Sequence, residues 1–353
     1  MKHLLRVLLC SFSVAAPFAA HAQYNPIGAH GAPMGNASGA GADAVSPLGQ
    51  LSQVAPLSFP PPRGAFDVPI SVQYTGGNQV GEAGVGWTLP YAYVRVSNSV
   101  VGRKPAAHLN APEATTRVLL SMGGAVTVMN YHATDNVYYP MVGAQTLALV
   151  RDRRYPSGWI ATDGTGTKYY FSPQPALGDD SLWLLTSITD TSGNRLTLTY
   201  QVDDYPEGKE LALVDVRYAH NVGGCAKFRL ELQYGAPSGP GTVLGHVNDH
   251  GHTRVRVKLL NRIVVWSRTD ASCAYEEPLR AFRFLYVPDA DNHKPRLADV
   301  ILDGAADDQD GPATVPLAHY EYGRATTPAS DPGEAARLVF RLTSSTLLPR
   351  DIT

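Results

Sequence analysis

The chain has 353 residues, which is enough for two domains or for one large β domain. Its 29 basic and 31 acidic residues give a formal net charge of −2, so no basic surface indicates a nucleic-acid partner. Charged residues make up only 17% of the chain, and its 33 glycines and 27 prolines favour many short elements over long helices.

The first 22 residues have the three parts of a secretory signal peptide. Lys2 and Arg6 give a positive start, residues 7–16 form an apolar run, and Ala-His-Ala precedes a cleavage point after Ala22. The alternative is a membrane anchor, but the run is shorter than the ~20 residues that cross a bilayer. We therefore expect a secreted protein, either periplasmic, on the cell surface or extracellular, with no membrane span.

Residues 23–58 are rich in Gly, Ala, Pro and Ser and contain few large side chains. This composition is typical of a flexible leader. We expect one β domain over residues 59–353, which could divide near residue 180.

From residue 66 onward, short segments alternate apolar and polar residues and contain many β-branched and aromatic side chains. Turn sequences such as TGGN, DGTG, TSGN and YPEG separate them. This pattern predicts antiparallel strands joined as hairpins. The predicted fold class is all-β, with hairpin repeats that form a large twisted sheet.

The sequence GEAGVGWTLP at residues 81–90 places one tryptophan among glycines, between two segments that resemble strands. Glycine within a strand often marks the close approach of another backbone, and an indole ring is costly to leave in water. We predict that Gly84 and Gly86 let a neighbouring backbone approach. Trp87 and Leu89 then point into the core.

A degenerate repeat occupies the second half of the chain. Each unit begins with Leu-x-x-Ile or Leu-x-x-Val and ends in an alternating strand that closes on tyrosine. Stacked hairpins share one core that none of them can bury singly. We expect each tyrosine to close its hairpin, with the ring buried and the hydroxyl at a solvent-exposed rim, rather than to stack on a ligand. The units begin at Leu185, Leu213, Leu260 and Leu297 and close at Tyr200, Tyr234, Tyr286 and Tyr322.

The chain has three cysteines, and Cys10 leaves with the signal peptide. Cys225 and Cys273 remain, as an even pair in an oxidising compartment. We predict a disulfide that closes a loop of about 48 residues; the alternative is two separate buried thiols.

Two polar loops are weak candidates for metal sites. The sequence HVNDHGH contains His246, His250 and His252, and three imidazoles so close together could bind zinc. Asp308 and Asp310 stand two apart before a glycine, as at the start of a short calcium loop, but the later acidic ligand is missing. Solvated hairpin turns explain both loops better, so we expect neither a metal nor a cofactor.

The last segment, from residue 337, begins another strand, and no closing tyrosine strand follows it. An unpaired strand edge tends to recruit a partner strand or to aggregate. We therefore expect either that the protein continues beyond Thr353 or that another chain completes the sheet.

Several blocks, in this order, resemble a known family. VPISVQY with GEAGVGWTLPYAYVRV, then DGTGTKYYFS, LWLLTSITDTSGNRLTLTY and LVDVRY, are similar to the SpvB-type virulence protein domain, which also begins the B component of insecticidal toxin complexes. The last blocks also resemble the YD/Rhs repeat, in which strands end in tyrosine. The resemblance covers roughly residues 56–340.

The resemblance implies part of an Rhs-like β-shell, because in toxin B components this region forms part of a hollow shell around a separate toxin. In SpvB-type proteins it precedes a separate ADP-ribosylating enzyme with a Glu-x-Glu pair. This chain has no Glu-x-Glu, since Glu276 and Glu277 are adjacent. The resemblance thus carries over the shell character but not the toxic activity.

The sequence contains no Gly-x-Ser-x-Gly, phosphate-loop or His-Glu-x-x-His motif, so we expect no enzyme. Our first hypothesis is a structural shell or scaffold module of an exported SpvB/Rhs-like toxin or surface system, which encloses or presents a partner polypeptide. The alternative is an exported β-rich binding module that recognises a cell-surface protein or glycan. A hydrolase built from residues far apart in the sequence is a third option.

Overall fold

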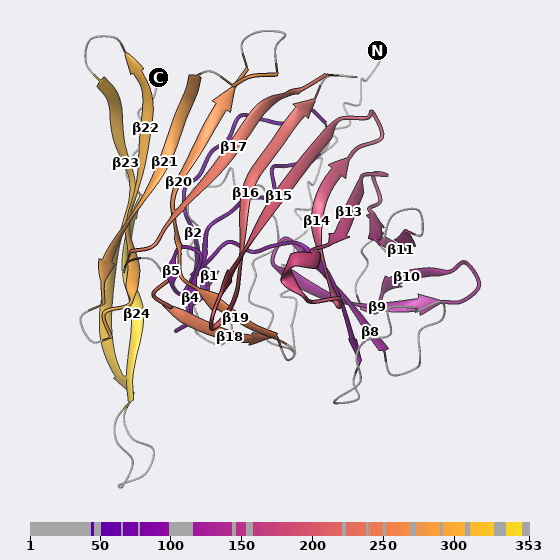
Figure 1. Ribbon diagram of the computed structural model, residues 1–353, viewed down its shortest axis with the longest axis horizontal. Helices are drawn as coiled ribbons and strands as arrows, with labels where there is room; N and C mark the ends of the chain where they lie inside the picture. Colours follow the sequence, from indigo (N-terminus) through magenta and orange to yellow (C-terminus); the bar gives the residue numbers. More distant parts are fainter. Residues whose placement is uncertain are drawn as a thin grey trace, which may run out of the picture.

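The chain folds into antiparallel β-structure, which confirms the predicted all-β class (Figure 1). The computed structural model describes residues 44–45, 51–64, 66–76, 78–98, 116–142, 146–152, 158–220, 224–237, 239, 241–249, 252–268, 273–275, 277–289, 292–307, 311–327 and 337–347. The predicted signal peptide, Cys10, His250, Asp308 and Asp310 lie outside these residues. Within the described ranges, the helical structure is one 3-10 turn, η1 (Pro175–Leu177), and no helix has the length and apolar character needed to cross a membrane.

Eight consecutive strands close into a ring. Each strand pairs antiparallel with the next, and the last returns to the first through three residue pairs, such as Trp183 with Val94. Leu120, Leu149 and Trp159 are buried among the aromatic and aliphatic side chains of the core that the ring encloses. The strands are β7 (Tyr93–Asn98), β8 (Thr116–Met122), β9 (Ala125–His132), β10 (Val137–Pro140), β11 (Ala148–Asp152), β12 (Gly158–Thr162), β13 (Lys168–Pro173) and β14 (Leu182–Thr189).

Strand β14 belongs both to this ring and to a larger sheet. One of its edges pairs with β13 from residue 183 to residue 189, with one register shift. Its other edge pairs with β7 at residues 182–184 and with β15 at residues 187–189. The sheet therefore forks at β14.

The larger sheet continues from β14 as a series of long antiparallel hairpins, which Figure 1 shows side by side with strong twist. In the sequence, a hairpin of β18 (Gly245–Asp249) and β19 (His252–Arg256) is inserted between β17 and β20, which still pair directly with each other. The hairpin contacts β16 through a single parallel bridge, Lys209 with Arg254. The long strands are β15 (Arg195–Tyr205), β16 (Gly208–His220), β17 (Ala226–Gly235), β20 (Leu259–Ser267), β21 (Glu277–Pro288), β22 (Pro295–Asp307), β23 (Gly311–Thr327) and β24 (Arg337–Leu347).

The N-terminal segment covers one face of this sheet with short strands. They are β1 (Ala44–Val45), β2 (Leu51–Val54), β3 (Gln73–Tyr74), β4 (Val80–Gly81), β5 (Gly84–Val85) and β6 (Trp87–Thr88). The sequence analysis expected a flexible leader that extends to residue 58. In the structure β2 pairs with β3, and Ala55 and Leu57 are buried. These apolar residues lie in the same core as the sheet, so the ordered part begins earlier than composition suggested.

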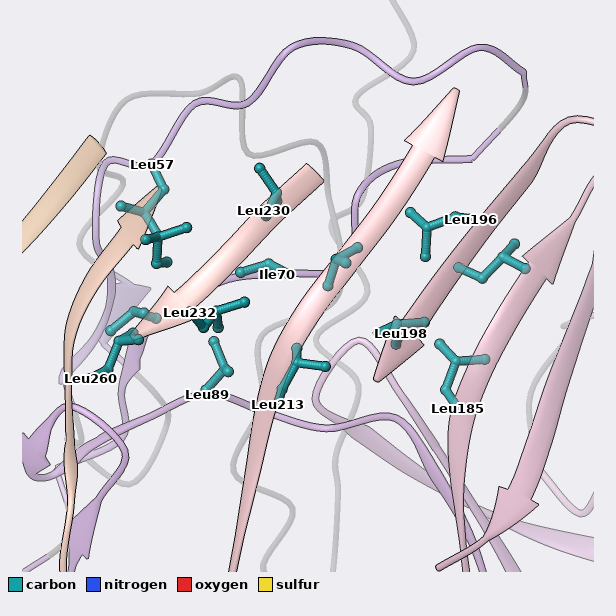
Figure 2. Packing of buried hydrophobic residues seen from close by; sticks show 14 of the residues in the cluster. Leu57, Ile70, Leu89, Leu185, Leu196, Leu198, Leu213, Leu230, Leu232 and Leu260 are labelled. Carbon is teal, nitrogen blue, oxygen red and sulfur yellow. The ribbon is translucent and has the colours of Figure 1, made fainter. Parts of the chain in front are cut away.

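One hydrophobic core joins the three parts. Leu57, Ile70 and Leu89 of the N-terminal segment pack on leucines of β14, β15, β16, β17 and β20, as Figure 2 shows. The strands alternate because one face of each contributes to this core, while ion pairs such as those of Asp215 with Arg217 and Arg229 lie on the other face. The sheet therefore has an apolar face that is already covered by its own chain.

Candidate functional site

The four closing tyrosines form a series of identical hydrogen bonds, which we call the tyrosine ladder. Each hydroxyl donates to the backbone carbonyl of the leucine that begins its own hairpin. The bonds run from Tyr200 to Leu185 (2.9 Å), Tyr234 to Leu213 (2.9 Å), Tyr286 to Leu260 (2.6 Å) and Tyr322 to Leu297 (2.6 Å). The sequence repeat is thus a repeat of one tertiary contact.

Each tyrosine of the ladder also lies at a β-bulge. The register of the pairing shifts between the tyrosine and the residue before it, so the partner strand carries one extra residue there. On the partner strand the tyrosine pairs with the leucine of the next unit: Tyr200 with Leu213, Tyr234 with Leu260, Tyr286 with Leu297 and Tyr322 with Leu342. The ladder therefore runs across the sheet, with one bulge where the tyrosine strand of each unit pairs with the strand that follows it.

From the sequence we expected the tyrosine hydroxyls to lie at a solvent-exposed rim, but in the structure they lie within the sheet and donate to backbone carbonyls. Burial raises the pKa of Tyr200, Tyr234, Tyr286 and Tyr322 above the ordinary tyrosine value. The physical reason is the bulge: a carbonyl at a disrupted pairing inside the core requires a donor, and the tyrosine supplies it. The hydroxyls of these tyrosines are therefore already engaged in hydrogen bonds within the sheet.

The glycine–tryptophan block attaches the N-terminal segment to the last step of the ladder. Trp87 is fully buried, and its Nε1 donates to the Tyr322 hydroxyl at 2.8 Å. Its ring centroid lies 4.6 Å from that of Tyr320 and 5.4 Å from that of Tyr74. Trp87, Tyr322 and the Leu297 carbonyl thus form one hydrogen-bonded chain.

The two glycines of this block have different roles. A Cβ on Gly84 would lie 2.8 Å from the carbonyl oxygen of Pro295, and its φ is +94°. Gly84 therefore permits the close approach of β22, as the sequence suggested. Gly86 has a φ of +77°, which favours glycine for its backbone conformation.

Sequence reasoning missed a buried ion cluster beside this block. Arg256 of β19 donates to Glu82 and, at 3.2 Å, to Glu210 of β16. Burial alone would lower the pKa of Arg256, but the carboxylates of Glu82 and Glu210 outweigh it and hold the pKa above its ordinary value. Oε1 of Glu210 also accepts the backbone N–H of Val257 (3.0 Å) and Lys258 (3.1 Å). A lone Glu in an apolar, glycine-rich block was the only sequence signal of this cluster.

A third carboxylate, that of Asp179, holds another part of the β18–β19 hairpin. It lies 3.4 Å from Arg95, 3.2 Å from Arg254 and 3.6 Å from His252. Burial alone would raise the pKa of Asp179, but hydrogen bonds from Ser181 and the positive charge of Arg95 hold it below the ordinary value. The hairpin is therefore held by ion pairs to both the ring and the sheet.

The histidines of the HVNDHGH loop are not gathered in the described structure. His246 is exposed on β18, whereas His252 points to Asp179. His250 is outside the described residues, as are Asp308 and Asp310. No group of three His, Cys, Asp or Glu side chains suited to a metal ion occurs in the part of the chain that the structure describes.

Cys225 and Cys273 are joined by a disulfide, with their Cα atoms 5.5 Å apart. The bond ties the start of β17 to the segment that leads into β21. Near it, the Tyr275 hydroxyl donates to the carbonyl of Ala226 at 2.8 Å. Both contacts anchor the end of the long hairpins that lies away from the N-terminal block.

A small cavity of about 20 Å³ lies between the ring and the sheet. Its lining includes Tyr91, Leu185, Tyr200 and Leu213. The hydroxyl of Tyr91 is buried there and has no hydrogen-bond partner within the described ranges of the chain. A space of this size holds about one water molecule, so it does not suit a substrate.

Comparison with known proteins shows the fold of the chain. No family model and no curated protein matches it. The TcdB2-TccC3-Cdc42 crystal structure matches at 14% identity and a TM-score of 0.57, over 80% of this chain and 16% of that chain. The Photorhabdus luminescens Tc holotoxin pore matches at 14% identity and a TM-score of 0.54, over 90% of this chain and 18% of that one.

The N-terminal domain of the effector SpvB from Salmonella typhimurium strain LT2 has similar scores, with 14% identity and a TM-score of 0.54, but a different coverage. The match spans 75% of this chain and 98% of that domain. The chain therefore covers a whole SpvB-type domain but only about a sixth of the toxin-complex chains. This confirms, at the level of the fold, the relationship that the sequence blocks suggested.

Proposed function

We propose that this protein is a non-enzymatic structural module of an exported SpvB/Rhs-like toxin or surface system, and that its sheet encloses or presents a partner polypeptide. The observation that carries the proposal is the tyrosine ladder. Each step is the same hydrogen bond between two adjacent strands, so the sheet can extend by repeating this contact. Likeness in fold to structures that contain TcdB2 together with TccC3 supports a role in an assembly of several components.

The edge of β24 is the part of the module that would take a further strand. Leu342 occupies on β24 the position that Leu213, Leu260 and Leu297 occupy on earlier strands, because it pairs with Tyr322 at the same bulge. Among the described residues, β24 pairs with β23 alone. A partner strand that carries a tyrosine at the corresponding position would donate its hydroxyl to the carbonyl of Leu342.

A synthetic strand tests this proposal directly. The peptide has the sequence of β21 (Glu277–Pro288), whose Tyr286 makes the same contact with Leu260 within the protein. We expect the peptide to bind the protein, and we expect its Tyr286→Phe version to bind about fivefold more weakly, which corresponds to one hydrogen bond. Equal binding by both peptides would refute the role of the tyrosine.

Two proline variants of β24 supply the matched control. Consecutive N–H groups of a strand point to opposite edges, and proline removes one of them. Of Val339→Pro and Phe340→Pro, one therefore disrupts pairing with β23, while the other blocks only the outer edge. We expect one variant to keep the unfolding midpoint of the parent and to lose peptide binding. If both prolines leave binding intact and the protein stays a stable monomer, the binding-module alternative is favoured.

A further inference from the structure

Arg151 lies inside the eight-stranded ring in an unusual environment. It shares a face of β11 with the buried Leu149 and pairs across the strands with Trp159. Its guanidinium carbon lies 4.7 Å from the ring centroid of Trp159 and 4.8 Å from that of Trp183. The two indoles lie edge to face, with centroids 6.0 Å apart, and Tyr138 packs on Trp159 at 5.4 Å. The cation is therefore held against aromatic rings in a fixed orientation.

This guanidinium has cation–π contacts but no acceptor. Within the described residues, Arg151 has neither a carboxylate at ion-pair distance nor a hydrogen bond, whereas Arg256 and Arg283 have carboxylate partners at 3.2 Å and 3.0 Å. Burial lowers the pKa of Arg151, and the side chain is only partly exposed. A half-buried arginine with five unused N–H donors is costly to leave unpaired.

The two indoles add further donors without acceptors. Nε1 of Trp159 and Nε1 of Trp183 are buried and have no hydrogen-bond partner among the residues that the structure describes. The other two tryptophans differ, because Trp87 donates to Tyr322 at 2.8 Å and Trp266 donates to Glu231 at 2.9 Å. The cluster of Arg151, Trp159 and Trp183 therefore combines one positive charge with unused donors.

We propose that Arg151, backed by Trp159 and Trp183, binds the carboxylate of an acidic side chain in a partner polypeptide. The two indole rings lie within 5 Å of the guanidinium carbon and offer no acceptor to its N–H groups. A planar, bidentate acceptor would satisfy these N–H groups, and a carboxylate has that shape. A sugar would need an exposed aromatic face to stack on, but Trp159 is 1% exposed and Trp183 is 5% exposed. The slim carboxylate of Glu or Asp fits this site better than a pyranose ring.

This inference is independent of the proposed strand addition. Arg151 lies on β11 of the ring, whereas strand addition concerns the edge of β24 at the far end of the sheet. Either interaction can therefore fail without the other. Together they would give the partner polypeptide two separate points of attachment.

The four tryptophans provide an internal control for the test. The ¹⁵N-labelled protein is titrated with a blocked tetraglutamate peptide, and the indole N–H signals are followed by NMR. Because the guanidinium lies on the rings of Trp159 and Trp183, we expect these two signals to shift with saturation, while those of Trp87 and Trp266 stay in place. Trp159→Phe and Trp183→Phe assign the two signals, since each variant removes one of them.

Variants of the arginine define the chemistry. Arg151→Gln should weaken peptide binding at least about tenfold, because it removes the charge and the bidentate fork. Arg151→Lys should fall between Arg151→Gln and the parent, since it keeps the charge only. Arg117→Gln, at an exposed position on β8 of the same ring, should bind like the parent. Unchanged Trp87 and Trp266 signals in each variant establish that the fold is intact.

Three results would overturn the proposal. The first is that the Trp159 and Trp183 signals do not respond to tetraglutamate. The second is an equal response to blocked tetraglutamine or in Arg151→Gln, which would mean that the carboxylate is not recognised. The third is a stronger response to glucuronic acid than to tetraglutamate, which would make the ligand an acidic glycan.

Discussion

Replacement of Trp87 by alanine tests the central packing argument of this fold. The side chain is fully buried, lies against Tyr74 and Tyr320, and donates a hydrogen bond to the Tyr322 hydroxyl. Truncation of a buried tryptophan costs about 3–5 kcal/mol, through lost burial and the cavity that remains. Trp87→Phe keeps a ring but loses the indole N–H, and should cost about 1–2 kcal/mol. We expect Trp87→Ala to remove a large part of the stability of the protein.

The measurement is urea unfolding followed by far-UV circular dichroism, with the disulfide intact and linear extrapolation to water. Trp266→Ala is the matched control, because Trp266 also donates through Nε1, to Glu231 at 2.9 Å, but lies partly exposed on the outer face. It should cost about 1 kcal/mol. A loss below about 1 kcal/mol for Trp87→Ala, or equal losses for both variants, would refute the view that this block fixes the N-terminal segment to the sheet.

Three further predictions concern the backbone, the disulfide and pH. Gly84→Ala should cost about 3 kcal/mol because its Cβ meets the backbone of β22, whereas Gly193→Ala, with φ of +81° and no neighbour within 4 Å, should cost about 1 kcal/mol; equal losses in urea unfolding would contradict this. Reduction of the Cys225–Cys273 disulfide, which spans 48 residues, should lower the free energy of unfolding by about 4 kcal/mol, and a Cys225→Ser/Cys273→Ser variant should no longer respond to reductant. The pKa of Asp179 is depressed in the folded state, so its stabilisation is present at pH 7 and is lost progressively as the pH falls below about 3.9 and through the pKa of the folded carboxyl group; Asp179→Asn should therefore cost about 3 kcal/mol at pH 7 and less as the pH is lowered, and a cost that does not change with pH would exclude this linkage.

The sequence predicted the strands well, because alternation along a strand is a local property. Segments such as residues 195–205 and 277–288 have one face in the core, and their period of two is visible without the fold. The closure of the ring was not predictable in this way. Pairing of Trp183 with Val94 joins residues far apart in the chain, and no local pattern specifies which edge of β14 receives β7.

In the candidate site too, contacts that depend on tertiary structure were not predictable from the sequence. The repeating tyrosines were recognised, but the acceptor of each hydroxyl depends on a bulge in the neighbouring strand, which is a property of register and not of composition. Arg151 gave no signal either. An arginine in an alternating strand normally faces solvent, and only the ring brings Trp159 and Trp183 against it.

The tyrosine ladder also explains how a long twisted sheet keeps one register. A strand that slips by one residue exchanges its buried and exposed faces, and a slip by two keeps the faces but misplaces the bulge. Misplacement would leave the carbonyl of Leu213 or Leu260 without its tyrosine donor in the core. Each hairpin thus has a polar contact that selects one alignment among those that the apolar pattern permits. Because each hydrogen bond joins only adjacent strands, its contribution to stability does not depend on how many hairpins the sheet contains. The register of each strand is therefore specified by its neighbours alone, and a sheet that grows by successive strand addition requires this property.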